Sequence, residues 1–356
     1  MVILPALMIA SSLTSDSAFA QRGLALTARI QKEFALPDSH LYAEKHGESQ
    51  PAFDWSVGVW LSALNSAVEL DAGYKKALRE FADATWVYWN DKGPVPGYDV
   101  LPAPKPVDRY YDDNAWMVMA LVETYDHLGD AKYLDWAQKS LSYVLSGEDE
   151  KLGGGIYWRE SDRGASKNTC SNAPSAAACL AVWEKTKDGK LLAKARELYA
   201  WTYKTLRDPD DGLMWDAISA DGKIEKMKWS YNTALMIRTA AGLYAATKRE
   251  TYRRQALEFE AAATKHWFDP ATGALKDEGK FGHLLTEAFL FRRKWAPGGD
   301  DKAVEASRRA LENLESASKS KEGWYPARWD QGAPSGAPAL IDQAAVARGY
   351  LEMAAR

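Results

Sequence analysis

Two adjacent carboxylates, Asp112 and Asp113, stand between aromatic residues at the start of an apolar part of the sequence. They belong to the stretch Tyr110-Tyr111-Asp112-Asp113-Asn114-Ala115-Trp116. No charge follows as far as Val122, so a helix that begins here would be apolar on nearly every face and therefore buried. Two carboxyl groups at such a helix start can act as a catalytic pair, one as an acid and one as a nucleophile.

Helix capping is the alternative explanation for these acids. Asp is a favoured N-cap residue, and its negative charge suits the positive end of the helix dipole. A cap needs only one Asp and no aromatic neighbours, whereas here two Asp residues follow two Tyr residues. We therefore predict that Asp112 and Asp113 are catalytic.

The spacing of the pair agrees with one class of reaction. Retaining glycosidases hold their two carboxyl groups about 5–5.5 Å apart, and inverting glycosidases hold them about 6.5–9.5 Å apart. Neighbouring residues at a helix start can reach the shorter distance. A like charge next door raises the pKa of one carboxyl, while helix N–H groups favour ionisation of the other.

Composition narrows the partner to a small neutral ligand. The 356 residues include 45 Lys and Arg against 49 Asp and Glu, a net charge of −4, and no basic block is present. Nothing therefore suggests a nucleic-acid or anionic-membrane partner. Fifteen Trp and seventeen Tyr are many for this length, and such rings serve as stacking platforms for sugars.

The first 20 residues are typical of a signal peptide. They are apolar and end in Ala18-Phe19-Ala20, a small-x-small pattern, although they lack the usual positive charge near the start. We expect export to the periplasm or the medium, with residues 21–356 as one catalytic domain. The apolar run from Val2 to Ala10 is far below the roughly 20 residues of a membrane span, and no later run qualifies.

Only two cysteines, Cys170 and Cys179, are present. An exported location permits a disulfide between them, but a position inside a helix would favour two buried free thiols, so both remain open. We expect no metal and no cofactor, because the sequence contains no recognised metal-ligand spacing. We also expect a monomer.

Helical segments alternate between two kinds along the chain. Twelve are expected, near residues 22–36, 54–70, 72–90, 112–128, 130–146, 173–187, 189–207, 229–247, 249–267, 283–296, 300–317 and 338–354. Amphipathic outer helices are expected at 130–146, 189–207, 249–267 and 300–317. Apolar inner helices, rich in Ala, Met and Leu, are expected at 112–128, 173–187, 229–247 and 338–354.

Similar short turns join inner to outer helices and recur roughly every 60 residues, which indicates a repeated helical hairpin. This period exceeds that of common helical solenoids, so six hairpins closing into an (α/α)6 barrel are expected. The long connections all precede inner helices and must therefore gather at one end of the barrel. Loops of this length are usually functional, and these carry many aromatic and amide side chains.

Four blocks of sequence together resemble glycoside hydrolase family 76, the retaining endo-α-1,6-mannanases. They are Tyr110 to Trp116, Gly153-Gly154-Gly155-Ile156-Tyr157-Trp158, Lys167-Asn168-Thr169-Cys170-Ser171-Asn172 and Trp229-Ser230-Tyr231-Asn232. The resemblance covers roughly residues 50–295. The chain departs from the common family pattern at Met117, at Thr233-Ala234 and at Phe281-Gly282-His283, which leaves internal or terminal cleavage open.

This resemblance implies an (α/α)6 barrel that hydrolyses α-1,6-linked mannose backbones. It places Asp112 in the position of the nucleophile and Asp113 in that of the general acid/base. Residues in or beside the four blocks are the expected sugar contacts: Tyr111, Asn114, Trp158, Asn168, Asn172, Trp229, Tyr231 and Asn232.

Three other functions are compatible with such a barrel. A sugar 2-epimerase would use paired histidines, but His40, His46, His127, His266 and His283 show no paired spacing. An unsaturated-uronide hydrolase would need loop cations to bind a carboxylate, and Arg159, Arg163, Lys226, Lys228 and Arg328 keep that function open. A non-catalytic glycan-binding protein could use the same cleft.

Overall fold

The structure is a computed structural model that describes residues 5–104 and 107–355. Its described part contains twelve α-helices, as expected. The bounds are α1 Pro5–Glu33, α2 Asp54–Leu70, α3 Lys75–Ala84, α4 Tyr111–Leu128, α5 Ala131–Ser146, α6 Thr169–Thr186, α7 Gly189–Leu206, α8 Ser230–Thr247, α9 Glu250–Trp267, α10 Gly279–Trp295, α11 Lys302–Asn313 and α12 Leu340–Ala355.

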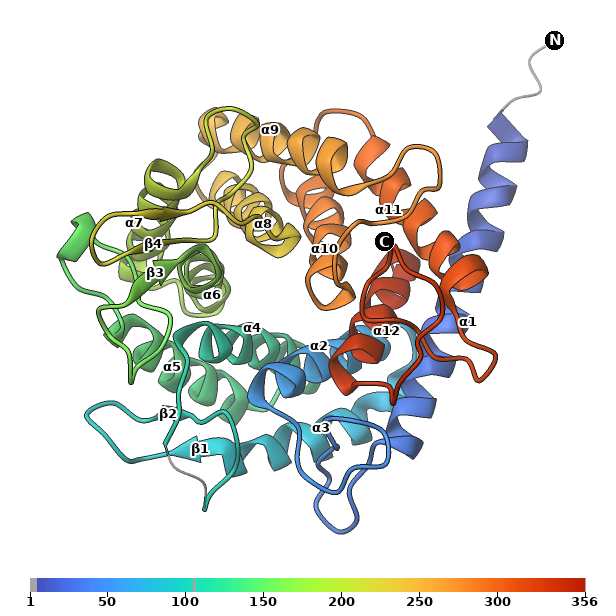
Figure 1. Ribbon diagram of the computed structural model, residues 1–356, viewed down its shortest axis with the longest axis horizontal. Helices are drawn as coiled ribbons and strands as arrows, with labels where there is room; N and C mark the ends of the chain where they lie inside the picture. The colour runs from blue at the N-terminus through green and yellow to red at the C-terminus, as the bar shows by residue number, and fades with distance from the viewer. Residues whose placement is uncertain (1–4, 105–106, 356) are drawn as a thin grey trace.

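The even-numbered helices form a closed inner ring, and the odd-numbered helices surround it (Figure 1). Around this ring α2, α4, α6, α8, α10 and α12 each pack against the next, and α12 packs against α2. The N-terminal helix α1 packs on α12, so the two ends of the chain make the sixth hairpin. This is the predicted (α/α)6 barrel.

Local sequence explains the repeated hairpin turns. Inner helices α4, α6 and α8 each end at a residue in the left-handed conformation, namely Gly129, Lys187 and Lys248. Asp130 and Asp188 then cap the outer helices, because their carboxylates accept the backbone N–H of Lys132 and Lys190. Each turn therefore stops one helix and starts the next within a few residues.

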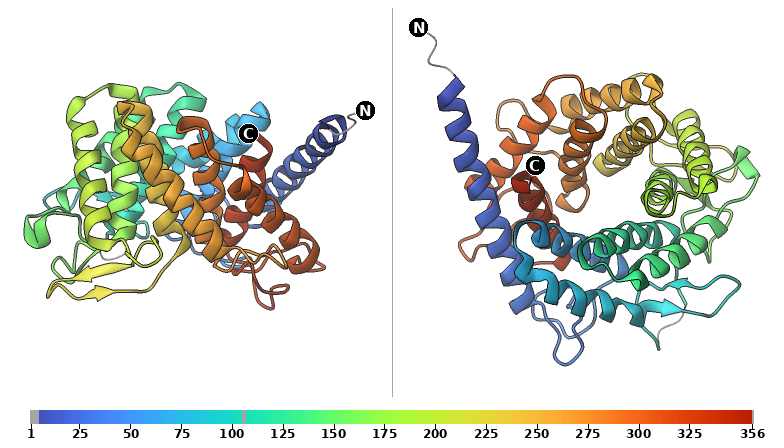
Figure 2. Two further views of the ribbon diagram at one scale, coloured as in Figure 1. Left: turned by 90° about the horizontal axis from the view of Figure 1, so that it is seen from above. Right: turned by 180° about the vertical axis from the view of Figure 1, so that it is seen from behind.

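Only short strands occur among the described residues. An antiparallel pair joins β1 (Trp89–Asn90) to β2 (Gly97–Tyr98), and a three-stranded antiparallel sheet has the order β3 (Ser166–Asn168), β4 (Ala217–Ser219), β5 (Ile224–Glu225). The β4–β5 hairpin lies at the end of the barrel where the inner helices begin, seen at the lower edge of the left view in Figure 2.

Helix α1 begins much earlier than the predicted segment at 22–36. The buried ring of Phe19 stacks on Tyr350 with centroids 5.8 Å apart, and Asp16 pairs with Arg308 at 2.8 Å. The apolar residues assigned to a signal peptide therefore continue the same helix. Residues 1–4 of that segment lie outside the described residues, and cleavage after Ala20 stays a prediction that would remove both contacts.

Helices α6 and α10 also begin about four residues before the predicted starts. Pro174 and the pair Gly279 and Gly282 are poor helix formers, which moved the predicted boundaries too late. These residues are buried in the inner ring, where tertiary packing outweighs local preference.

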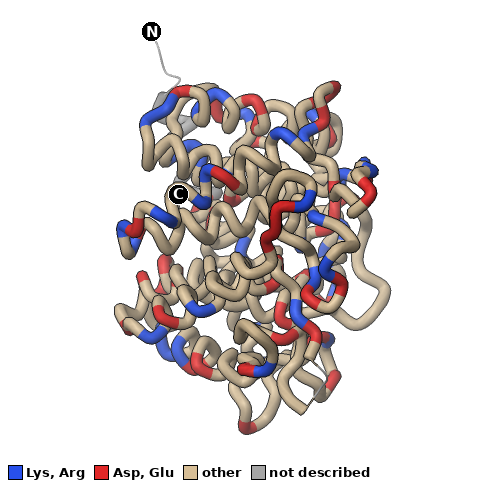
Figure 3. Tube along the Cα trace, turned by 90° about the vertical axis from the view of Figure 1, so that its left-hand side faces the viewer, with Lys and Arg blue, Asp and Glu red and all other residues tan. Residues whose placement is uncertain are grey.

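Charge is spread over the molecule rather than collected. Acidic and basic residues alternate along the face shown in Figure 3. No helix in the described part of the chain combines the length and the apolar character that a membrane span requires.

Candidate active site

A cavity of about 640 Å³ opens where the inner helices begin. Both acids of the predicted pair, Asp112 and Asp113, line it. Its other lining residues come from the long loops and the first turns of the inner helices: Glu44, Phe53, Trp55, Ser56, Val100, Asp108, Tyr110, Trp116, Trp158, Asn168, Cys170, Asp216, Trp229, Tyr231, Lys280, Phe281 and Ile341. The barrel thus brings four distant sequence blocks to one site.

Asp112 is a buried carboxylate, and among the described residues one of its oxygens accepts a side-chain hydrogen bond while the other, Oδ1, has no partner. It lies in the first turn of α4 and is 9% exposed, and its Oδ2 accepts a hydrogen bond from the indole Nε1 of Trp158 at 3.1 Å. Burial raises the pKa of Asp112 to about 6, while hydrogen bonds from Cys170, Trp158 and the helix-start N–H groups oppose that rise.

Asp113 has a different electrostatic environment. Burial raises its pKa well above the ordinary value, and the negative charges of Asp112, Asp54 and Asp108 raise it further. Hydrogen bonding favours the charged form of Asp112 and like charges oppose that of Asp113, so the pKa of Asp113 is the more strongly raised of the two. One site can therefore offer an ionised carboxylate beside a carboxylic acid.

A third carboxyl group, Asp54, lies next to the pair at the first residue of α2. It is 1% exposed, and among the described residues neither of its oxygens has a hydrogen-bond partner. Burial, followed by the charge of Asp99, raises the pKa of Asp54 well above its ordinary value. In the sequence, Asp54 stands alone at a helix start and belongs to none of the four blocks.

Aromatic rings form one wall of the cavity. Phe281 stacks on Tyr231 at 4.5 Å and on Trp55 at 5.6 Å between centroids, and Trp229 lies 5.2 Å from Phe281. Trp229 and Tyr231 therefore lie where a sugar platform was predicted. Trp55 and Phe281 complete this wall from helices α2 and α10, and neither was among the predicted sugar contacts.

Trp158 also lines the cavity and packs against Tyr110 at 5.1 Å between centroids. It is 42% exposed and at the same time donates its N–H to Asp112. Trp158 can therefore act on the carboxylate directly, a role beyond the stacking that the sequence suggested. Asn168 is 8% exposed and also lines the cavity.

Four of the predicted sugar contacts do not line the cavity: Tyr111, Asn114, Asn172 and Asn232. Tyr111 is buried and stacks on Tyr143 at 5.0 Å. Asn232 is fully buried, and its amide nitrogen donates to Asp216 at 3.4 Å. The structure gives these residues contacts within the fold, and their contact with a ligand stays a prediction.

Asn114 and Asn172 clamp loops in the same way on successive inner helices. The side-chain amide of Asn114 pairs with the backbone N–H and C=O of Tyr98 at 2.8 and 3.0 Å. Asn172 makes the same two bonds with Ile156, at 2.7 and 2.9 Å. Both Asn side chains are fully buried, so they position the loops over the cavity.

Asp216 and Lys280 are cavity residues that sequence reasoning missed. Asp216 sits at the end of a Trp-Asp pair in a long loop, and burial raises its pKa. The ammonium of Lys280 lies 5.5 Å from the ring of Trp55 and pairs with Glu278 at 2.6 Å. The loop location of Asp216 beside an aromatic residue was the one signal that could have found it.

None of the five histidines lines this cavity. His283, on α10, is buried with Nδ1 near the carbonyl of Gly279 at 3.1 Å, and burial together with Arg348 lowers its pKa to about 3. Cys170 and Cys179 are free, buried thiols on α6. No cluster of three or more potential metal ligands occurs within residues 5–104 and 107–355.

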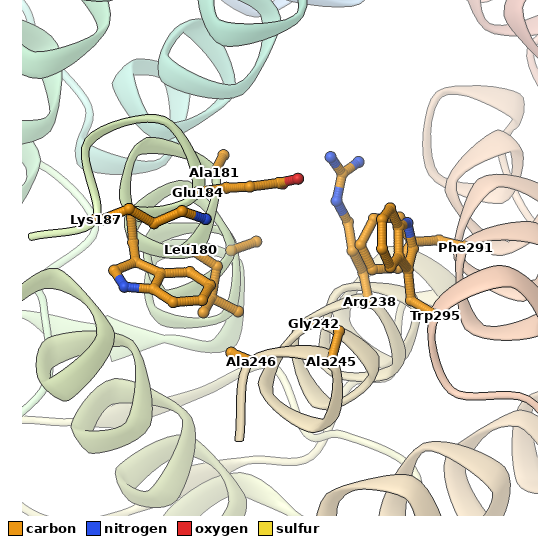
Figure 4. A pocket seen from close by; sticks show the side chains of 12 residues that line it. Leu180, Ala181, Glu184, Lys187, Arg238, Gly242, Ala245, Ala246, Phe291 and Trp295 are labelled. Carbon is orange, nitrogen blue, oxygen red and sulfur yellow. The ribbon is translucent and has the colours of Figure 1, made fainter. Parts of the chain in front are cut away.

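A second cavity, of about 220 Å³, lies toward the other ends of α6, α8 and α10. Figure 4 shows Glu184 and Arg238 extending into it, with Phe291 and Trp295 on the α10 side. It contains neither the acid pair nor any residue of the four sequence blocks. The larger cavity at the helix starts is therefore the candidate active site.

Comparison with known proteins agrees with this geometry. The family model described as glycosyl hydrolase family 76 matches residues 37–354. A search of curated proteins finds no match.

Three solved structures illustrate the similarity. A family 76 α-mannanase of Bacteroides thetaiotaomicron is 30% identical, with a TM-score of 0.86 over 96% of this chain and 95% of that one. An inactive α-1,6-mannanase variant of Salegentibacter sp. HEL1_6, in complex with α-1,6-mannotriose, is 23% identical, with a TM-score of 0.81 over 95% and 99%. Dfg5 of Chaetomium thermophilum, in complex with glucosamine, is 14% identical, with a TM-score of 0.79 over 95% and 90%. The family match spans most of the chain, and the chain therefore belongs to glycosyl hydrolase family 76 and is a glycoside hydrolase.

Proposed function

We propose that the protein cleaves α-1,6-mannosidic linkages in mannan-type polysaccharides or oligosaccharides with retention of configuration. Asp112 is the nucleophile and Asp113 the general acid/base. The observation that carries this proposal is the unequal environment of two adjacent carboxyl groups on one cavity wall. The indole N–H of Trp158 donates to Asp112, whereas the charges of three other carboxyl groups act on Asp113.

The two carboxyl groups divide the reaction into two steps. In the first, a carboxylate oxygen of Asp112 attacks the anomeric carbon while Asp113 gives its proton to the departing glycosidic oxygen. The product is a β-linked glycosyl ester on Asp112 and a free alcohol. In the second step Asp113, now a carboxylate, takes a proton from water, which displaces Asp112 and releases the sugar in the α configuration.

The charges of the cavity favour a neutral glycan over a uronide. Five acidic residues line it against one lysine: Glu44, Asp108, Asp112, Asp113 and Asp216 against Lys280. Of the loop cations that a uronide would need, Arg159 pairs with Asp108 at 2.7 Å and Lys228 with Asp208 at 2.6 Å. An anionic sugar would therefore meet repulsion from the acidic lining, and at least two of the loop cations are already paired with acids, which disfavours an unsaturated-uronide hydrolase.

The substrate class is tested by incubating the purified protein with linear α-1,6-mannan and sizing the products. Oligosaccharides of decreasing length would indicate internal cleavage, and mannose alone from the start would indicate terminal cleavage. The anomer released first, followed by NMR, should be α. Unchanged mannan together with measurable mannan binding would instead favour a glycan-binding protein.

Export to the periplasm or medium belongs to the same proposal, because such polysaccharides lie outside the cytoplasm.

The dependence of kcat/KM on pH should be bell-shaped. Asp112 must be ionised to attack, so activity should fall as pH drops through the pKa of about 6 of this carboxyl. Asp113 must keep its proton, so activity should fall again at higher pH, above its raised pKa. The two apparent values belong to the interacting pair. A rate that stays constant from pH 7 down to pH 4 would contradict the assignment of Asp112.

Replacement of Trp229 by Ala should raise KM for manno-oligosaccharides about tenfold with little change in kcat. Trp229 is half-buried on the cavity wall, so a ring contact of about 1–2 kcal/mol would be lost without opening the core. Trp295→Ala, beside the second cavity, is the matched control and should keep the wild-type KM. A lower melting temperature of Trp229→Ala with unchanged KM would assign this ring to packing alone.

A further inference from the structure

We infer that Lys167 is a positioning residue for the nucleophile: its buried ammonium fixes residues 147–158, here called the strap, so that Trp158 at the end of the strap donates its N–H to Asp112. The role of Asp112 as nucleophile rests on the proposed function. The geometric link between Lys167 and Asp112 does not, because it is made of contacts in the free protein.

The ammonium of Lys167 is surrounded by strap oxygens. Lys167 is fully buried, and its Nζ donates to the carbonyls of Asp149, Lys151 and Gly154 at 3.0, 2.8 and 2.8 Å. The carboxylate of Asp149 accepts from the same Nζ at 2.7 Å. Three carbonyls that converge on one point suit a compact ammonium better than the planar fork of an arginine.

The ring of Tyr157 adds two further contacts to this centre. It lies 4.7 Å from the Lys167 ammonium, and its hydroxyl donates to Asp149 at 2.8 Å. A buried charge is tolerated only when it is paired and hydrogen-bonded, and here both conditions are met. The charged Lys167 side chain therefore holds the strap by several contacts at once.

Two residues at the end of the strap, Tyr157 and Trp158, connect the Lys167 contacts to Asp112. The backbone of Tyr157 bridges to that of Lys167, and the N–H of Trp158 donates to the carbonyl of Ser166 at 3.3 Å. The carbonyl of Trp158 accepts from the N–H of Tyr111 at 3.0 Å, next to Asp112. The indole is thus held at both ends of its backbone while Nε1 meets Oδ2 of Asp112 at 3.1 Å.

Glycine makes this close course of the strap feasible. Gly155 has a φ of +84°, and a Cβ there would lie 2.8 Å from the ring of Trp201. The side-chain amide of Asn172 holds the next residue, Ile156, by hydrogen bonds to its backbone N–H and C=O. Lys167 is therefore the charged member of a set of contacts that leave Trp158 little freedom.

The test is the titration of the Asp112 carboxyl in the substrate-free protein, followed by carbon-detected NMR. Trp158→Phe keeps a ring but removes the N–H, so the pKa of Asp112 should rise by about one unit. Lys167→Met should shift it in the same direction, and the double variant should shift it no further than Trp158→Phe alone. Activity at pH 5 should fall about tenfold in each, in line with the smaller ionised fraction.

Lys185→Met is the matched control, because Lys185 pairs with Asp126 at 2.6 Å at the other end of the barrel. It should leave the Asp112 titration unchanged. If Lys167→Met does not fold, Asp149→Asn removes the same ion pair more gently and should give a smaller shift of the same sign. A folded Lys167→Met or Asp149→Asn with the wild-type Asp112 titration overturns the inference and leaves Lys167 a purely structural residue.

The two proposals fail in different ways. A protein in which these variants shift the Asp112 titration but which does not cleave α-1,6-mannan would keep the positioning link and refute the proposed function. Cleavage of mannan with additive, unlinked effects of Lys167→Met and Trp158→Phe would keep the function and refute the link.

Discussion

Asp112→Asn is expected to lower kcat by at least about 10³-fold on every α-mannoside while the protein stays folded. The amide has the shape of the carboxyl and can also occupy the first turn of a helix, but it cannot form the glycosyl ester. Initial rates on an aryl α-mannoside and on α-1,6-mannan measure the loss. Asp126→Asn, on the same helix at the far end of the barrel, is the control and should retain activity.

The same substitution should make the protein more stable at neutral pH. The folded pKa of Asp112, about 6, lies above the unfolded value of about 3.9. The contribution of Asp112 to wild-type stability is therefore fully present below the unfolded pKa and is lost as pH rises through the folded pKa. At pH 7 the Asn variant avoids this cost, and its free energy of unfolding should exceed that of the wild type by on the order of 1–3 kcal/mol. An inactive variant that is also much less stable would instead indicate damage to the fold.

Much of the architecture could be predicted because it depends on local patterns. Apolar segments such as the one from Ala115 to Val122 can only be buried, and amphipathic segments can only cover them. The alternation therefore predicted the closed ring and most helix bounds. The start of helix α1 was predicted too late in the chain, because a signal peptide and a buried helix have similar apolar compositions. Only the packing of Phe19 on Tyr350 shows that this segment belongs to the fold.

The candidate site could be predicted only in part. Asp112 and Asp113 could be recognised because they are adjacent in the sequence. A side-chain amide in a motif, however, can contact either a ligand or the backbone of a loop. Asn114 faces the backbone of Tyr98, 16 residues before it, and no spacing rule indicates that pairing. Phe281 and Lys280 reach the cavity only because α10 closes beside α8.

Some contacts become visible only in three dimensions. The donation from Trp158 to Asp112 joins residues 46 positions apart, and the sequence offered Trp158 only as an aromatic ring. Asp54 lies farther still from the pair along the sequence and, although Phe53 and Trp55 flank it, it has no acidic neighbour that marks it as one of a pair. Its charge environment follows from the barrel, where α2 and α4 are adjacent.

Asp113→Asn is expected to give a loss that depends on the leaving group. Without the acid, the departing oxygen must leave as an anion, so kcat on α-1,6-mannan should fall by about 10²–10⁴-fold. A dinitrophenyl α-mannoside needs little protonation, and its first step should proceed at close to the wild-type rate. The glycosyl ester should then accumulate, because no carboxylate activates water, and a burst of phenolate should be seen.

Added azide distinguishes this variant from Asp112→Asn. Azide needs no general base, so it should attack the ester in Asp113→Asn and restore turnover, releasing the α-mannosyl azide with overall retention. In Asp112→Asn no ester forms, and azide could only displace the leaving group directly to give the β-azide. The anomeric configuration of the azide product, determined by NMR, therefore distinguishes the roles of the two residues without relying on a rate. An α-azide from Asp112→Asn together with a β-azide from Asp113→Asn would exchange the two roles, in conflict with the Trp158 donor on Asp112 and the like charges that act on Asp113.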